Sequence, residues 1–394
     1  MSKVLLGLFL LEKLFMCVSK HKELFFRRMI EVLDTINVVF ELENMVGDYI
    51  EVELFDLLRK FFRRRGYYDL LKESDGRSLS IRLSYPRFFD NTNAYLITTK
   101  EECLEVNKAF IEEIRKFIYF EEVGVGVRSN GEVLLKWFEA NVAIKLKRVD
   151  VAFTHILEKD DSFNGYKNLY QLLNNIYMKM NPSSIPKNIS VIGNNEVETL
   201  MFTDTQNVGA YNRKIVIYNQ YRKFCDYCSK NPLQLHSILQ KYPDLPRRVR
   251  IEASKRIRRK PFEVLDFMEF DIFNAYVQQF ADDTLNNLFN KELFDSVFQD
   301  RIEWLKETIK KEREYPNFNY QAFIYRFIDE IWDYELIRKA IMETTDNLNS
   351  AYQACSTIRE ILKIYEKATG IKFFNMKETF EKIQKDLIKI RGEK

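Results

Sequence analysis

The chain has 394 residues, of which 46% are hydrophobic and 30% are charged. This length favours two domains or more, and the composition is that of a soluble protein with a buried core. The 12 glycines and 8 prolines are too few for long disordered linkers. The five cysteines cannot form an even set of disulfides, and there is no convincing secretory signal, so we expect a reducing, cytoplasmic environment.

The net charge of +3 is unevenly distributed along the chain. Residues 247–260, here called the basic run, contain eight lysines or arginines and one glutamate, so they carry +7 and the remainder sums to 3 − 7 = −4. A local basic run in an otherwise acidic chain indicates contact with a polyanion. The alternative is a charged edge strand that prevents pairing between sheets.

An apolar segment near the N-terminus, residues 4–18, is interrupted by Glu12 and Lys13. A membrane-spanning helix needs about 20 apolar residues, so we expect an amphipathic helix here and no membrane partner. A cleaved signal peptide is the weaker alternative. Because a second possible start, Met29, directly precedes the first strand-like run, we expect residues 1–28 to be an N-terminal extension of the main fold.

The alternation of apolar and polar residues changes repeatedly between strand and helix spacing over residues 29–270. In chain order, the predicted elements are a strand over 35–42, a helix over 46–72, a strand over 78–85, a helix over 100–117, a strand over 143–153, a helix over 166–180, and strands over 190–192, 199–203, 213–218 and 247–253. Pro86 is expected to end its strand before a turn at residues 90–93. This pattern predicts an α+β domain built on an antiparallel sheet.

The character of the sequence changes after Pro261, and we expect an all-helical C-terminal domain over residues 271–394. Its predicted helices cover residues 293–314, 322–344, 350–366 and 376–391. The last turn of the third helix is followed by Gly370 and a strand-like Lys372-Phe373, a pattern typical of a helix-turn-helix or winged-helix module that reads origin DNA. A helical bundle or partner-binding surface is the alternative.

Two acidic side chains lie on the polar side of predicted strands. Asp150 stands between Val149 and Val151, and Glu252 follows Ile251 in its strand. An acid at mid-strand is costly to bury unless a partner satisfies it. Two such carboxylates suit a hard divalent cation such as Mg²⁺ or Mn²⁺. The alternative is a salt bridge from each acid to the arginine two residues before it.

A tyrosine ends a third strand in the same way, since Tyr218 lies opposite Ile215 and Ile217. A phenol beside a metal can attack a phosphodiester, but its ordinary pKa of about 10 requires activation by a base or a cation. The alternative is a half-buried strand tyrosine, one of 21 in the chain. Tyr221, three residues further on, is the rival nucleophile.

Three motifs follow one another in the chain, namely RVDVAF at residues 148–153, RKIVIYNQYRK at 213–223 and VRIEASKRIRRK at 249–260. Together with SYPRFFDNTNAY at residues 84–95 and the polar stretch 203–213, they resemble the filamentous-phage gene II type of phage and plasmid rolling-circle replication initiators. Each motif alone is weak, and their order and spacing over residues 29–262 make the resemblance specific.

The resemblance implies a site- and strand-specific DNA nickase and religase. It implies Tyr218 as the nucleophile that forms a 5′-phosphotyrosine, Tyr221 as a candidate second nucleophile, and Asp150 and Glu252 as ligands of Mg²⁺ or Mn²⁺. The implied partners are origin DNA, single-stranded or supercoiled, with a host helicase and polymerase. The alternatives are a non-enzymatic DNA-binding regulator of the helix-turn-helix type and a plasmid-mobilisation relaxase.

The chain departs from that family in two respects. Residues 91–93 read Asn-Thr-Asn where the family usually has a turn like Gly-His-Asn. Many rolling-circle nickases bind metal through paired histidines, whereas this chain has only His21, His155 and His236. A site made of carboxylates, or of carboxylates and one other ligand, is therefore implied. His155 is a candidate third ligand, and a surface or core histidine is its alternative.

Six side chains of the basic run are expected to contact DNA phosphates, namely Arg248, Arg250, Lys255, Arg256, Arg258 and Arg259. Such contacts position a strand but carry little sequence information. Cys225 and Cys228 have the spacing of a metal-binding pair. A structural zinc site needs four ligands and the sequence has no second pair, so we expect no metal there.

Overall fold

The computed structural model describes residues 29–392 except 43–48, 65, 75–76, 96, 98, 121–129, 160, 180–187, 193–197, 207–210, 230 and 374. The predicted N-terminal extension, residues 1–28, lies outside the described residues. Among the residues that are described, no helix has both the length and the apolar character needed to cross a membrane.

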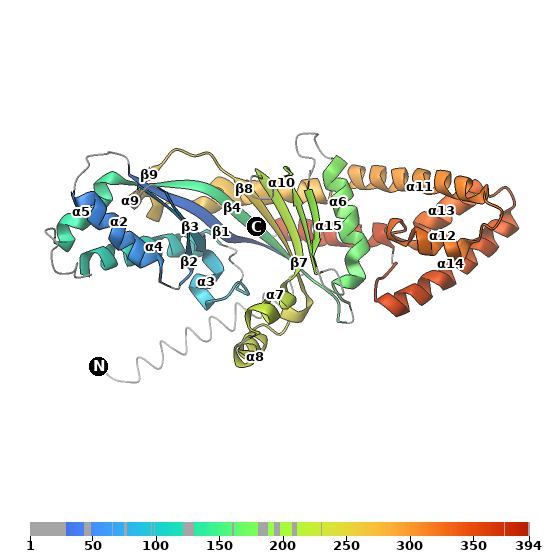
Figure 1. The fold of residues 1–394 in the computed structure, drawn as a ribbon, viewed down its shortest axis with the longest axis horizontal. Coiled ribbons are helices and arrows are strands. Elements are labelled where there is room, and N and C mark those ends of the chain that lie inside the picture. Colours follow the sequence, from blue (N-terminus) through green and yellow to red (C-terminus); the bar gives the residue numbers. More distant parts are fainter. Residues whose placement is uncertain are drawn as a thin grey trace.

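One antiparallel sheet runs through the centre of the molecule (Figure 1). Its strand order is β2-β3-β1-β4-β8-β7-β6-β5, and the short β9 pairs with β4. The strands are β1 (Met29–Leu42), β2 (Tyr68–Ser74), β3 (Ser78–Ser84), β4 (Val142–Ile156), β5 (Asn188–Ile192), β6 (Thr199–Thr203), β7 (Arg213–Asn219), β8 (Arg248–Arg256) and β9 (Phe262–Glu263). With the helices that follow, this sheet confirms the α+β fold class.

Helices surround this sheet and extend beyond one end of it (Figure 1). In the first part of the chain they are α2 (Tyr49–Phe62), α3 (Tyr85–Asp90), α4 (Lys100–Phe120), α5 (Gly131–Asn141), α6 (Lys167–Lys179), α7 (Gln220–Tyr227) and α8 (Pro232–Lys241). In the later part they are α9 (Val264–Met268), α10 (Gln278–Leu288), α11 (Lys291–Arg313), α12 (Tyr320–Arg326), α13 (Tyr334–Thr344), α14 (Leu348–Thr369) and α15 (Met376–Gly392).

One face of the sheet, here called the helix-covered face, is apolar. Alternate residues of β4 point to this face, and Val149, Val151 and Phe153 are completely buried there. At one end of the sheet, Phe40 of β1 packs against Phe62 of α2 and against α4. At the other end, α10 packs against β4 and α15 against β1. Burying this face supplies the main stabilisation of the fold.

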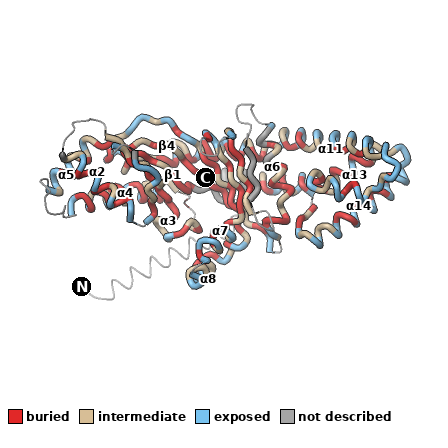
Figure 2. Tube along the Cα trace, in the orientation of Figure 1, coloured by how far each residue is buried: buried red, intermediate tan, exposed pale blue. Residues whose placement is uncertain are grey.

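The helical C-terminal part shares this core. A single cluster of buried apolar residues extends from Leu33 in β1 to Ile383 in α15, across the boundary predicted at residue 270. Figure 2 shows the buried positions continuing from the strands into the inner sides of α6, α11 and α13. The composition changes near residue 262. Of the helices after it, α9, α10 and α15 pack against strands of the sheet, whereas α11 packs against α13 and α6 beyond one end of the sheet.

Four sequence-based boundaries differ from the structure. Residues 68–72, predicted as helix, belong to β2, because Tyr68 and Leu70 pair with β3. Pro86 lies in the first turn of α3, where its missing N–H costs nothing. The helix predicted over residues 322–344 is interrupted between Arg326 and Tyr334. Residues 372–373 form no strand, so the described C-terminal part lacks the wing of a winged helix.

Candidate active site

The strands that carry Asp150, Glu252 and Tyr218 are neighbours in the order β4-β8-β7. Residues opposite each other in antiparallel strands point to the same face. Glu252 lies opposite Ala152 on β4 and opposite Val216 on β7. Asp150 is two residues from Ala152 on β4, and Tyr218 is two residues from Val216 on β7. All three side chains are therefore on one side of the sheet, here called the charged face, as the alternation predicts.

Tyr218 is buried, with 5% of its surface exposed. Its hydroxyl donates to Oε2 of Glu252 at 3.3 Å, and Nζ of Lys223 donates to that hydroxyl at 3.4 Å. Burial raises the pKa of Tyr218 well above its ordinary value, Arg250 opposes this, and Glu252 adds to it. The Tyr218 phenol is therefore protonated at neutral pH, and its proton points at the Glu252 carboxylate.

The position of Lys223 follows from a local capping interaction. The side chain of Asn219 accepts a hydrogen bond from the backbone N–H of Arg222 at 3.2 Å, which ends β7 and begins α7. The first turn of α7 then brings the Lys223 ammonium 4.5 Å from the centre of the Tyr218 ring. A cation so placed favours the phenolate over the phenol.

Glu252 combines burial with several neighbouring cations. Burial is the largest single influence and would raise the pKa of its carboxyl, but the neighbouring cations, led by Lys223 and Arg250, together outweigh it and lower the pKa. The carboxyl is therefore ionised at neutral pH and can accept a proton. Its place between the phenol and the cations suits a general base that acts on Tyr218.

Asp150 is more deeply buried, with 1% of its surface exposed. Burial raises its pKa to about 7, although Arg148 opposes this shift, and Glu252 raises the pKa further. One carboxylate oxygen, Oδ2, accepts from Arg148 at 2.6 Å. The other, Oδ1, is buried and has no hydrogen-bond partner in the described part of the chain. An unsatisfied buried oxygen of this kind is a candidate ligand.

The structure adds a third carboxylate that the sequence analysis missed. A β-bulge between Leu33 and Thr35 places Asp34 beside β4 on the charged face, where Oδ1 lies 3.0 Å from Arg250. Burial raises the pKa of Asp34, Arg250 lowers it, and Glu252 raises it. Asp34 directly precedes the strand predicted from residue 35, but the bulge that turns it towards Arg250 has no signature in the sequence.

Arg250 and Arg248, predicted to contact DNA, are instead internal. Arg250 is completely buried between Asp34 and the backbone carbonyl of Asn93, to which it donates at 3.2 Å. Arg248 pairs with Asp244 at 2.8 Å and donates to the carbonyl of Ala94. Both arginines thus hold the loop after α3 against the charged face, and neither is exposed for a phosphate.

The rest of the basic run is divided among different surroundings because adjacent strand residues point to opposite faces. Arg256 and Arg258 are exposed. Lys255 is on the helix-covered face, 5.6 Å from the ring of Phe280. Arg259 lies over the ring of Phe262 at 4.4 Å. The run is therefore not one continuous surface stripe.

Tyr221 and His155 point away from the carboxylates. Tyr221 lies on α7 and packs against a small apolar cluster that includes Phe224 and Cys228. His155 lies opposite Val249 on the helix-covered face, 5.9 Å from the ring of Tyr166. The third-ligand hypothesis for His155 is therefore wrong, because His155 is five positions after Asp150 in the strand and an odd offset places it on the opposite face.

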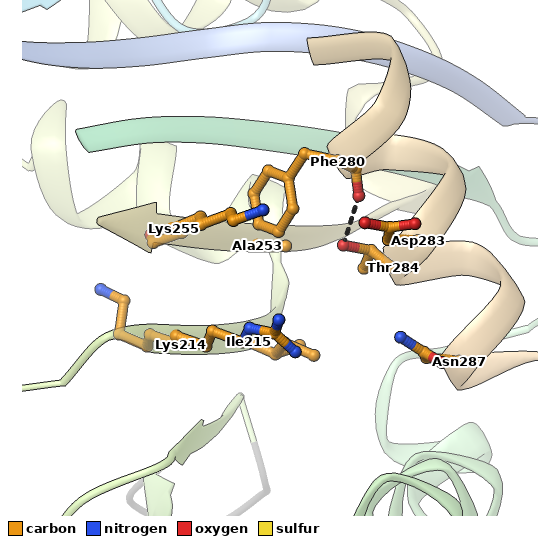
Figure 3. A pocket seen from close by; sticks show the side chains of 10 residues that line it. Lys214, Ile215, Ala253, Lys255, Phe280, Asp283, Thr284 and Asn287 are labelled. Carbon is orange, nitrogen blue, oxygen red and sulfur yellow. Dashed lines mark hydrogen bonds between the residues drawn. The ribbon is translucent and has the colours of Figure 1, made fainter. Parts of the chain in front are cut away.

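A cavity of about 30 Å³ separates β7 and β8 from α10 (Figure 3). Lys255, Phe280 and Thr284 lie on its walls, and the Thr284 hydroxyl donates to the Phe280 carbonyl of its own helix. This volume accepts one or two water molecules and no nucleotide. The cavity lies on the helix-covered side, so the chemistry belongs to the charged face.

No protein-family model matches the chain, and no curated protein matches it. A solved structure described as a rolling circle replication initiator protein from Geobacillus stearothermophilus is similar at 12% sequence identity and a TM-score of 0.22. That similarity covers 61% of this chain and 79% of the other. A similarity this distant carries no argument, so the function is argued from the charged face.

Proposed function

We propose that this protein initiates rolling-circle DNA replication by nicking and rejoining one DNA strand through Tyr218. The observation that carries the proposal is the hydrogen bond from the Tyr218 phenol to Glu252, with the Lys223 ammonium within reach of the same oxygen. A buried structural tyrosine needs one partner. This one faces both an ionised base and a cation, which is the arrangement that a nucleophile requires.

In the proposed step, the Tyr218 oxygen attacks the scissile phosphorus as its proton passes to Glu252. A bond forms between the tyrosine oxygen and phosphorus, and the bond from phosphorus to the 3′ oxygen breaks. The proton that Glu252 accepted passes, directly or through water, to the 3′ oxygen, which leaves as a hydroxyl. Lys223 stabilises the developing phenolate. The reverse attack, by a 3′ hydroxyl on the phosphotyrosine, rejoins the strand.

The residues present fit a divalent cation. Among the described residues, no three His, Cys, Asp or Glu side chains gather closely enough to form a complete metal site. Mg²⁺ commonly uses only one or two carboxylates together with water and a substrate phosphate. Asp150, through its unpartnered Oδ1, and Glu252 would hold Mg²⁺ or Mn²⁺ in this way. When bound, the ion would supply charge stabilisation at the phosphate.

We further propose that the C-terminal helices read the duplex origin. α13 and α14 are joined by three residues, 345–347, and pack against each other. Asn349, Gln353 and Thr357 are exposed on α14, and side chains of these types can pair with base edges in the major groove. The connection to a host helicase and polymerase follows only from the proposed role in replication.

The test uses supercoiled origin DNA with Mn²⁺ and detects a covalent protein–DNA adduct that resists phosphatase. Tyr218→Phe should abolish nicking and adduct formation while origin binding stays within a few fold. Tyr221→Phe is the matched control and should still form the adduct. Loss in Tyr221→Phe with full activity in Tyr218→Phe would assign the chemistry to the other tyrosine. If the unaltered protein binds the origin but forms no adduct, it is a non-enzymatic regulator.

A further inference from the structure

A second hollow lies far from Tyr218, between α2, α4 and the start of β2. Its volume is about 390 Å³, within the range of small-molecule binding sites. Phe61, Tyr68, Phe117 and Phe120 line it, together with Arg64, Lys116 and Glu113. In Figure 1, α2 and α4 lie at the end of the molecule away from α11 and α14.

The aromatic wall of this hollow is rigid and its rim is exposed. Phe61 stacks on Tyr68, with ring centres 4.9 Å apart and planes 19° from parallel. Both rings are largely buried, as is Phe117. In contrast, Phe120 has 73% of its surface exposed at the end of α4. An exposed phenyl ring beside a fixed aromatic wall offers a stacking surface that the core does not need.

Cations surround this aromatic surface. The Arg64 guanidinium lies 4.1 Å from the centre of the Phe117 ring, and Lys116 is exposed one turn before Phe120. Arg63, directly after α2, is ion-paired with Glu73 and does not line the hollow. Glu113 is the single carboxylate that lines the hollow among the described residues. The combination suits a ligand that has flat rings joined by negative charges.

We propose that this hollow binds an unpaired nucleotide of single-stranded DNA. A base stacks on the exposed ring of Phe120, which the buried aromatic wall supports, and the adjoining phosphates pair with Lys116 and Arg64. The inference rests on the proposed function for its DNA substrate. In the strand order, β2 and β7 are five inter-strand spacings apart, which is about 24 Å measured across the strands at about 4.8 Å per spacing. The hollow would therefore hold the displaced DNA strand at a distance from the nick.

The test measures binding of fluorescent oligothymidylates to the full chain without metal, so that no cleavage is needed. Phe120→Ala should weaken binding of a long oligonucleotide by about 5- to 150-fold, the range for one base–aromatic stack. Lys116→Ala should weaken it less and reduce its salt dependence. Tyr315→Ala is the matched control, because Tyr315 is 64% exposed and distant from the hollow, and it should bind normally.

A second measurement separates this proposal from the nickase proposal. Phe120→Ala should form the adduct normally with an oligonucleotide too short to extend from the nick to the hollow. Unchanged affinity for the long oligonucleotide in both Phe120→Ala and Lys116→Ala would overturn the hollow as a binding site, whatever the nicking assay shows. Absence of nicking by the unaltered protein, with the expected loss of affinity in the variants, would overturn only the nickase.

Discussion

The two faces of β4 and β8 are formed by alternate residues of the same strands, and the two sets of side chains are stabilised in different ways. On the helix-covered face, Val151 and Ile251 are buried against helices and need only apolar neighbours. On the charged face, Asp150 and Arg250 are just as buried and depend on specific opposite charges. The first face tolerates changes that conserve volume, whereas the second is sensitive to the loss of a single charge. That sensitivity is typical of a site that has to change charge during a reaction.

The largest effect should come from the proposed base. Glu252→Gln keeps the size of the side chain but removes the proton acceptor of Tyr218, so we expect the single-turnover nicking rate to fall by about 10²- to 10⁴-fold. Circular dichroism should show an intact fold. Glu263→Gln, at an exposed position of β9, is the control and should nick normally. A normal rate in Glu252→Gln would show that the charged face holds its acids for stability alone.

The next effect concerns the buried ion pair. Arg250→Met leaves Asp34 buried without its partner, and we expect the free energy of unfolding in urea to fall by about 3–5 kcal/mol. The double variant Arg250→Met with Asp34→Leu should recover much of that loss, since it removes both charges. Arg258→Met, at an exposed site, should change the free energy by less than about 0.5 kcal/mol. Equal stability of Arg250→Met and Arg258→Met would contradict the observed pairing.

Protonation of Asp150 gives a smaller effect. Its pKa of about 7 in the folded protein exceeds the ordinary value of 3.8, so the native state binds more protons between these two values. The free energy of unfolding contributed by this group therefore falls as the pH rises from about 4 to about 7, by at most about 4 kcal/mol. Asp150→Asn should flatten that dependence. A curve as steep as that of the unaltered protein would place the titration elsewhere.

The smallest effect should come from the exposed part of the basic run. Replacing Arg256, Arg258 and Lys260 with alanine should reduce the slope of log K against log salt for single-stranded DNA by about 2, if all three contact phosphates. The rate of nicking at saturating DNA should not change. Lys136→Ala, exposed on α5 away from the strands of the charged face, is the control. An unchanged slope in the triple variant would show that these cations only solubilise the sheet edge.

Much of the fold was predictable because it depends on local patterns. Alternation identified β4, β7 and β8, since a strand with one apolar face must alternate. It also placed Asp150, Glu252 and Tyr218 opposite their apolar neighbours. The same rule, applied further along β4, would have excluded His155. Residues 68–72 were misassigned because their apolar content suits either element, and only pairing with β3 decides between them.

Other features were decided by the tertiary structure alone. The sequence by itself determined which side chains of each strand share a face, because backbone geometry repeats every two residues. It could not determine that β8 lies between β4 and β7, which brings Glu252 to the Tyr218 phenol, nor that a bulge in β1 pairs Asp34 with Arg250. Strand order and bulges depend on contacts between residues far apart in the sequence, such as Tyr218 with Glu252 and Asp34 with Arg250. The balance of charge at Tyr218 exists only once those strands have assembled.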